Sequence, residues 1–159
     1  MNLRTHHRWA RLAGGLLLAA ALAQAAPVGI AEPLPATRAA TDPLAEAVLD
    51  AINRYRQRAG LPAWVADDAL TAIAVAHSQA QALQGRLSHG GFQSRFAQTR
   101  ARLCVENLAA GYGNGQAVVD AWRGSPQHHQ NLLDPDVDRV GLASTEGVVS
   151  MLACRFSGR

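Results

Sequence analysis

The chain has 159 residues, of which 48% are hydrophobic and 17% are charged, and its formal net charge is +3. The excess charges are Arg4, Arg8 and Arg11, whereas from Pro27 onward 12 arginines are balanced by 12 acidic residues. The part from Pro27 onward, whose charges balance, is expected to form the mature protein. Its composition therefore excludes a nucleic-acid-binding protein or one held to anionic membranes by charge.

Residues 1–26 have the pattern of a secretory signal peptide. A basic start is followed by an apolar run, Leu12 to Leu22, and then by small residues that suit cleavage. The run is too short for a stable bilayer span, so a retained anchor is the weaker alternative. We therefore expect a secreted protein, periplasmic or extracellular, with no stable membrane anchor after cleavage. Residues 27–41, rich in Pro, Ala and Thr, are predicted to be a flexible linker to a domain over residues 42–159.

Helices are predicted from capping residues and from apolar side chains at helical spacing. Asp42 caps the first, and either Asp67 or Asp68 caps the second, which Gly85 stops. Ser125 precedes a proline that begins the last, a short helix carrying two histidines. The expected helices cover residues 43–60, 68–84, 92–99, 116–123 and 126–131.

Strands are predicted mainly in the second half of the domain. Residues 102–106 form an apolar run that favours a strand. Residues 137–144 and 148–156 are predicted to pair as a hairpin across Thr145-Glu146-Gly147. Because helices come first and strands late, without strict alternation, an α+β fold is favoured over a parallel α/β sheet.

Cys104 and Cys154 are the only cysteines, and both lie in apolar, strand-like runs. An oxidising compartment favours a disulfide between them, and closing so long a loop stabilises by about 4 kcal/mol. The alternative is a pair of buried free thiols. Strand pairing must bring the two Cα atoms within about 7 Å for the bond to form.

Two residues outside the helices carry groups that bind metals or move protons. His89 follows a helix end and precedes two glycines, which makes its side chain accessible. Glu106 lies in an apolar strand context, where a buried carboxylate must be paired, protonated or bound to a metal. The alternatives are a solvated turn histidine and a strand-end carboxylate that faces water.

His128 and His129 are adjacent on a helical turn, so their side chains diverge by roughly 100° and cannot join one site. We expect His128 to share a face with Asn131 and His129 to face solvent. His77 lies on the apolar stripe of the second helix, where a lone histidine is more often a hydrogen-bonded core residue than a ligand.

The motifs of the chain occur in a characteristic order. They are Asn53-x-x-Arg56, Gly60-Leu61-Pro62, Ala76-His77-Ser78, Ser88-His89, Glu106-Asn107-x-Ala109-x-Gly111, Trp122-x-x-Ser125-Pro126-x-His128-x-x-Asn131 and Val140-Gly141. In this order they closely resemble the CAP superfamily (cysteine-rich secretory, antigen 5 and pathogenesis-related 1 proteins), and most of all its compact bacterial secreted, SCP-like branch. The resemblance covers residues 44–156.

This resemblance implies a three-layer α-β-α sandwich with a central antiparallel sheet and a cleft. The family cleft typically carries two His and two Glu, and in several members the histidines bind a divalent cation such as zinc. By motif position, His89 and His128 match the metal-binding histidines and Glu106 matches one glutamate, with Asn131 beside them in the cleft. The position of the second glutamate is Ser125 here, which weakens an acid/base pair more than it weakens metal binding.

Two functions follow as hypotheses. The first is a secreted binding module whose His/His/Glu cleft holds a divalent metal and binds a lipid, peptide or envelope component. The second is a metal-dependent hydrolase acting on peptide or cell-envelope polymer, with Glu106 as general base. A third interpretation gives the histidines and Glu106 a purely structural role. The absence of any nucleophile elbow or His-Glu-x-x-His helix favours the binding module.

Overall fold

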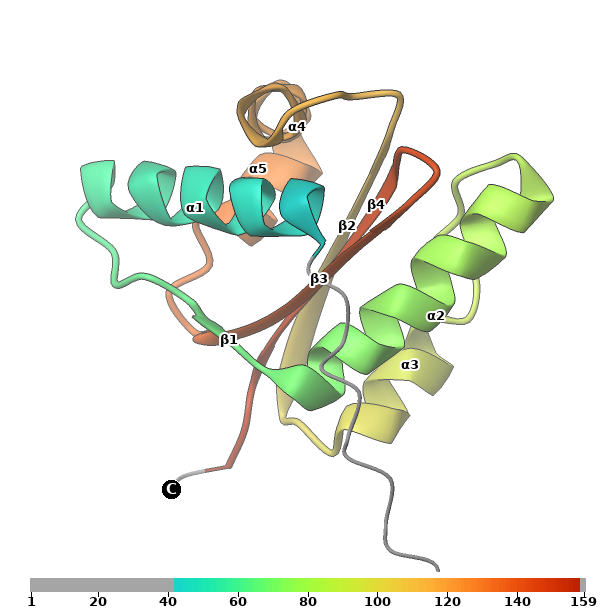
Figure 1. Cartoon of the computed structure of the whole chain (residues 1–159). Helices are drawn as coiled ribbons and strands as arrows, with labels where there is room; N and C mark the ends of the chain where they lie inside the picture. The colour runs from blue at the N-terminus through green and yellow to red at the C-terminus, as the bar shows by residue number, and fades with distance from the viewer. Residues whose placement is uncertain (1–41, 158–159) are drawn as a thin grey trace, which may run out of the picture. The chain divides into compact units, whose positions relative to one another are not determined.

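The computed structural model describes residues 42–157, so the predicted signal peptide (1–26) and linker (27–41) lie outside the described residues. None of the helices in residues 42–157 has the length and apolar character that crossing a bilayer requires. The described elements, in chain order, are α1 (Pro43–Arg58), β1 (Val65–Ala66), α2 (Asp68–Gln84), α3 (Phe92–Thr99), β2 (Leu103–Ala110), α4 (Gly115–Arg123), α5 (Pro126–Leu132), β3 (Arg139–Thr145) and β4 (Val148–Arg155) (Figure 1).

The predicted caps form as expected. The Asp42 carboxylate accepts the backbone N–H of Ala45, and the Asp67 carboxylate accepts that of Leu70. Gly85 ends α2 in the left-handed conformation, with φ of 61°. Local sequence therefore fixes where α1 begins and where α2 begins and ends.

The four strands form one sheet in the order β1-β3-β4-β2. β3 and β4 are the predicted hairpin, and β2 pairs antiparallel with β4. Two parts of the sheet were not predicted. β1 adds a short parallel partner to β3, and β2 continues to Ala110 rather than ending at Glu106, which places Glu106 in mid-strand.

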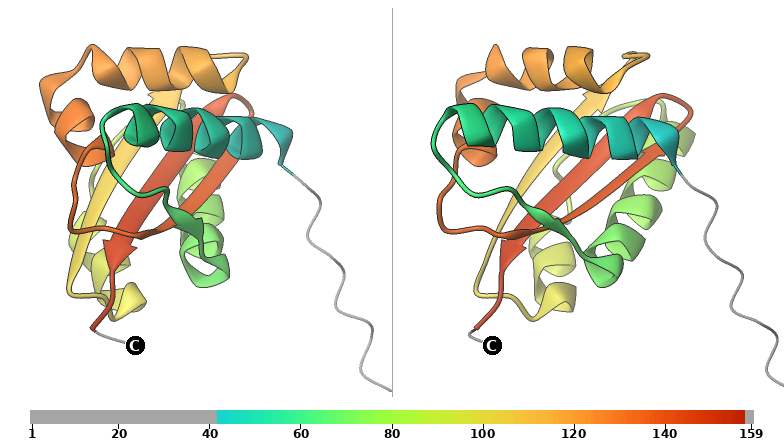
Figure 2. Two further views of the ribbon diagram at one scale, coloured as in Figure 1. Left: turned by 90° about the vertical axis from the view of Figure 1, so that its left-hand side faces the viewer. Right: turned by 60° about the vertical axis from the view of Figure 1, so that its left-hand side comes forward.

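The helices cover both faces of this sheet, as Figures 1 and 2 show. α2 packs on β3 and β4, with α3 beside it. α1, α4 and α5 pack together on the opposite face. The predicted α+β fold and its α-β-α sandwich are therefore confirmed.

The core is divided by the sheet into two clusters. Adjacent residues of β4 belong to different clusters, Met151 to the one under α1 and α4 and Leu152 to the one under α2. This is the alternation that a strand imposes on successive side chains. By the same alternation, Glu106 shares a face with Cys104 and points toward the α2–α3 layer.

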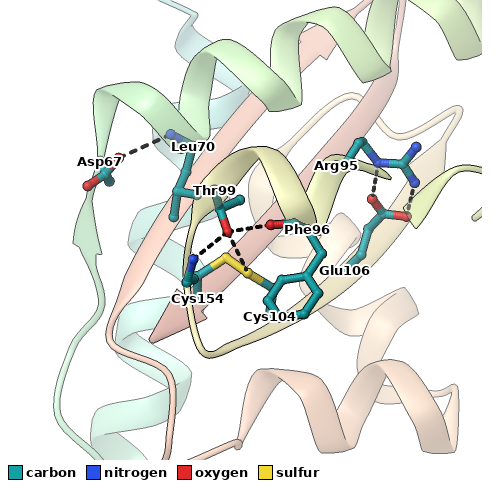
Figure 3. The surroundings of a disulfide bond; sticks show 9 residues. Asp67, Leu70, Arg95, Phe96, Thr99, Cys104, Glu106 and Cys154 are labelled. Atoms are coloured by element: carbon teal, nitrogen blue, oxygen red, sulfur yellow. Dashed lines mark hydrogen bonds and ion pairs between the residues drawn. A yellow bond between two sulfur atoms is a disulfide. The ribbon is translucent and has the colours of Figure 1, made fainter. Parts of the chain in front are cut away.

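The predicted disulfide joins Cys104 and Cys154, which lie opposite each other in the β2–β4 register (Figure 3). Their Cα atoms are 4.1 Å apart, well within the limit for a bond. The alternative of two free thiols is wrong, because the described part of the chain has no free cysteine.

One glycine is required by close packing between layers. A Cβ atom on Gly141 of β3 would overlap the backbone of Leu70 in α2. No side chain fits in that space, so Gly141 lets α2 lie directly on the sheet. The turn that holds His89 follows the end of α2.

Two of the motif residues hold the fold together. The Asn53 side-chain amide exchanges two hydrogen bonds with the backbone of Trp64 (2.9 and 3.1 Å). The fully buried Arg56 guanidinium donates to the carbonyls of Pro62 (3.0 Å) and Leu132 (2.8 Å). Asn53 and Arg56 therefore tie α1 to the connector after it and to the end of α5.

Candidate functional site

His89 lies in the turn between α2 and α3, and side chain to backbone hydrogen bonds fix this turn. The backbone N–H of Ser88 donates to the Gln81 side chain, and the N–H of Gly90 donates to the Ser88 hydroxyl (3.0 Å). The carbonyl of His89 accepts the N–H of Phe92 at the start of α3 (3.1 Å). The backbone of His89 is therefore well positioned while its side chain stays 53% exposed.

Glu106 is buried, with a side chain only 3% exposed, and it is paired. Its Oε2 accepts the Nε–H of Arg95 (2.7 Å) and its Oε1 accepts an Nη2–H of the same guanidinium (2.8 Å), the two-point contact drawn in Figure 3. Oε1 also lies 2.9 Å from Nδ1 of His89. The alternative of a strand-end carboxylate facing water is wrong.

Arg95 is the site residue that the sequence analysis missed. A buried strand carboxylate signals that a cation lies nearby, but the chain has 15 arginines and no local pattern singles out this one. Arg95 comes from α3, and only the packing of α3 on β2 brings its guanidinium to Glu106. The two-point geometry gives the pair both strength and a fixed orientation.

The contact with Glu106 sets the state of the His89 ring. A carboxylate accepts hydrogen bonds, so Nδ1 of His89 carries the proton in this contact. In the neutral ring with this tautomer, Nε2 carries the lone pair. A carboxylate that orients a histidine in this way is typical of histidines that bind metals.

His128 is held near His89 by a network of two asparagines. Asn131 donates to the side chain of Asn107 (2.8 Å) and to the backbone carbonyl of Glu106 (3.2 Å). Asn107 donates to the backbone carbonyl of His128 (3.1 Å). α5 is thereby fixed to β2, and the ring centroids of His89 and His128 are 6.1 Å apart.

The environment of His128 favours its neutral form. Burial lowers the pKa of the His128 imidazole below its usual range, and the neighbouring His89 lowers this pKa further. A neutral imidazole has the free lone pair that a metal ion needs. His128 is therefore a neutral imidazole at neutral pH, the form that can bind a metal ion.

His129 does not face solvent as predicted. Its Nε2 lies 2.7 Å from the Tyr55 hydroxyl of α1, and the ring is half-buried. The expectation that His128 and His129 diverge is confirmed, since one ring lies near His89 and the other contacts Tyr55. The solvent prediction failed because the Tyr55 side chain of α1 reaches the His129 ring.

Neither candidate residue, Ser125 nor Asp120, replaces the missing second glutamate. Ser125, at the corresponding position, is the N-cap of α5, and its side chain makes no capping hydrogen bond. Asp120 is exposed and pairs with Arg123 (3.0 Å) on the surface of α4. Neither side chain adds a carboxylate to the cleft.

The donor set fits a metal held by two histidines rather than by three ligands. Within residues 42–157, no three His, Cys, Asp or Glu side chains are grouped to hold a metal ion. Two imidazoles on one tetrahedral ion have centroids about 5 Å apart, given metal–nitrogen bonds of about 2.0–2.1 Å. The ring centroids of His89 and His128 are 6.1 Å apart, about 1 Å more than that value.

His77 is buried as predicted, at 5% exposure, but it is not hydrogen-bonded. Neither of its ring nitrogens has a partner among the residues that the structure describes. Burial lowers the pKa of His77 most, Arg95 and His89 lower it further, and Glu106 raises it. The imidazole is therefore neutral in the folded protein at neutral pH.

Acid is expected to destabilise the fold through His77. In the unfolded chain this histidine binds a proton near pH 6.5, whereas in the folded chain it does so only at lower pH. Between those pKa values the unfolded state binds more protons, so the free energy of unfolding falls as pH falls from about 7 to about 5. Urea unfolding of the protein and of His77→Phe at both pH values measures this. An identical pH dependence in both proteins would contradict the assignment.

Comparison with known families gives a match over most of the described chain. The model of the family described as "CAP: Cysteine-rich secretory protein family" matches residues 49–148. This segment includes His89, Glu106 and His128.

Three proteins with similar sequences or structures come from bacteria. The chain is 28% identical over 106 residues to the uncharacterized protein YkwD of Bacillus subtilis, covering 62% of this chain and 41% of YkwD. An extracellular protein of Bacillus anthracis that contains an SCP domain is 25% identical, with a TM-score of 0.65 over 69% of this chain and 39% of that one. An outer surface protein of Borrelia burgdorferi is 23% identical, with a TM-score of 0.64 over 70% of this chain and 92% of that one. The chain thus spans less than half the length of the two Bacillus proteins.

Proposed function

The chain belongs to the cysteine-rich secretory protein (CAP) family, and on this basis we propose that it is an exported binding module. In this proposal, His89 and His128 hold a divalent cation such as zinc. The cleft around them binds a lipid, peptide or cell-envelope component. The family assignment confirms the resemblance that the motifs indicated.

Export is supported by three observations. Residues 1–26 have the charge and hydropathy pattern of a signal peptide. The similar Bacillus anthracis protein is described as extracellular. The disulfide is consistent with an oxidising compartment, where such bonds persist.

The contact between His89 and Glu106 is the observation that carries the metal proposal. It fixes one ring nitrogen as a donor and leaves the other free on an exposed side chain near a neutral His128. A bound zinc ion supplies Lewis acidity and can attract an anionic or carbonyl group of a ligand. Glu106 orients His89, while Asn107 and Asn131 hold the backbone of α5 that carries His128.

The hydrogen bonds and the burial of Glu106 favour a binding module over a hydrolase. A general base needs a free lone pair within reach of a water molecule. The Glu106 carboxylate already accepts two hydrogen bonds on Oε1 and one on Oε2, and its side chain is only 3% exposed, so water has little access to the lone pair that Oε2 retains. In this arrangement Glu106 is a positioning residue for His89.

Isothermal titration with zinc chloride tests this function. We expect one saturable binding event in the protein and its loss in the double variant His89→Ala/His128→Ala. His129→Ala is the matched control, because it removes an adjacent imidazole that contacts Tyr55 instead of the cleft. Glu106→Gln should weaken zinc binding by about 10–100-fold, since it removes the carboxylate that orients His89. Equal zinc binding in the double variant would overturn the metal proposal.

A further inference from the structure

A cavity of about 410 Å³ lies between α2, the turn that follows it and α3. Ser88 and Gly90 line this cavity, whereas His89 between them contacts Glu106 and is not part of its lining. The cavity lining therefore includes none of His89, Glu106 and His128. Its volume is in the range that holds small molecules.

A buried group without a partner lies in the cavity lining. His77 of α2 is 5% exposed, lines the cavity, and has no hydrogen-bond partner for either ring nitrogen among the described residues. Both ring nitrogens are closed to solvent, so a molecule in the cavity pairs with His77 only when the ring turns toward it. Such pairing gains free energy because an unpaired buried polar group is unfavourable. A neutral imidazole offers one donor and one acceptor.

The charged side chains that line the cavity are two arginines, one of which is already paired with Glu106. Arg86 and Arg95 are its charged lining residues, and no Asp or Glu lines it. The guanidinium of Arg95 uses three of its five N–H groups, two on Glu106 and one on the carbonyl of Gly90 (2.9 Å). These contacts hold the guanidinium in a fixed orientation and leave two N–H groups for a ligand.

The remaining lining is mixed. Ile73, Ala76 and Ala80 give it an apolar part, and Gln81, Gln84 and Gln98 give it amides. A molecule with a short apolar chain and one anionic head group matches this combination. Guanidinium groups are suited to carboxylates and phosphates alike because both present paired oxygens.

We infer that this cavity binds a small molecule with a carboxylate or phosphate group, which Arg86 and Arg95 attract and His77 hydrogen-bonds. The inference is independent of the metal proposal, because none of the lining residues is one of the proposed metal ligands. Arg95 takes part in both sites, because it lines this cavity and also holds Glu106, which orients His89.

Titrations followed by backbone amide NMR shifts, in metal-free buffer near pH 7, test this site. The probes are sodium butyrate, inorganic phosphate and butyramide, the uncharged analogue of butyrate. We expect saturable shifts in α2 and α3 with at least one anion, and affinity for butyramide at least about tenfold weaker than for butyrate if butyrate binds. Saturation by butyrate alone identifies an organic carboxylate as the ligand type, and saturation by phosphate alone identifies a phosphate.

Variants locate the binding. Arg86→Gln should weaken anion binding about tenfold, whereas Arg54→Gln, which removes an exposed arginine of α1, should leave it unchanged. His77→Phe should abolish saturation, and it should fold because it replaces an unpaired polar ring with an apolar one. If neither anion saturates, or if Arg86→Gln and His77→Phe bind as the unaltered protein does, the inference is overturned.

Discussion

Replacing Glu106 with alanine is expected to lower the free energy of unfolding by about 3–5 kcal/mol. The carboxylate is 3% exposed and receives two hydrogen bonds from Arg95, whose side chain is 15% exposed. Removing the carboxylate leaves the guanidinium largely desolvated without its counter-charge. Removing one partner of a buried ion pair in this way lowers stability strongly, because the other charge stays buried and unpaired. His89 loses its orienting partner in the same variant. Urea unfolding at neutral pH measures the effect.

An exposed ion pair provides the matched control for this prediction. Asp138 and Arg155 lie 3.3 Å apart with side chains 47% and 50% exposed. Because water screens such pairs, Asp138→Ala should lower the free energy of unfolding by less than about 1 kcal/mol. If Glu106→Ala is no more destabilising than Asp138→Ala, then Arg95 does not depend on Glu106, and the proposed orientation of His89 loses its support.

Removing the Cys104–Cys154 disulfide is expected to lower the free energy of unfolding by about 4 kcal/mol. The bond joins residues 50 apart in sequence, so breaking it releases a long loop in the unfolded chain. Small domains are stable by only about 5–15 kcal/mol, and a loss of this size is a large fraction of that total. Urea unfolding of Cys104→Ala/Cys154→Ala against the oxidised protein measures it.

Reduction of the unaltered protein is the control for this variant. If the stabilisation comes from the closed loop, the reduced protein and the double variant should lose similar free energy, because both have the same open chain. The folded sheet should persist in both, since backbone pairing between β2 and β4 runs from Leu103 to Ala110. A loss below about 1 kcal/mol in the reduced protein would show that the loop is already constrained when unfolded.

Much of the secondary structure could be predicted because its signals are local. The carboxylates of Asp42 and Asp67 act on backbone groups three residues away, and Gly85 acts through its own φ. Glu146 and Gly147 likewise make a two-residue hairpin turn through positive φ angles of 49° and 78°. β1 was not predicted because a two-residue strand has no pattern of its own and forms only where β3 offers a partner.

The candidate site was predicted only in part. His89, Glu106 and His128 were identified by motif resemblance, and the structure brings the first two into contact. Arg95 was missed because its partner lies on another element. The structure also shows what the motif could not, that both Glu106 oxygens accept hydrogen bonds and that His129 contacts Tyr55.

The start of α1, both ends of α2, the β3–β4 hairpin, the family and the cysteine pair all follow from the amino-acid sequence, because each depends on short-range chemistry or on a recognisable motif. The burial of Glu106 with Arg95, the direction of each histidine ring and the unpaired state of His77 emerge only in the folded chain. Those features depend on how α3 and α5 pack against β2 and how α2 lies on the sheet. Packing joins residues distant in the chain, and no local spacing specifies which of them meet.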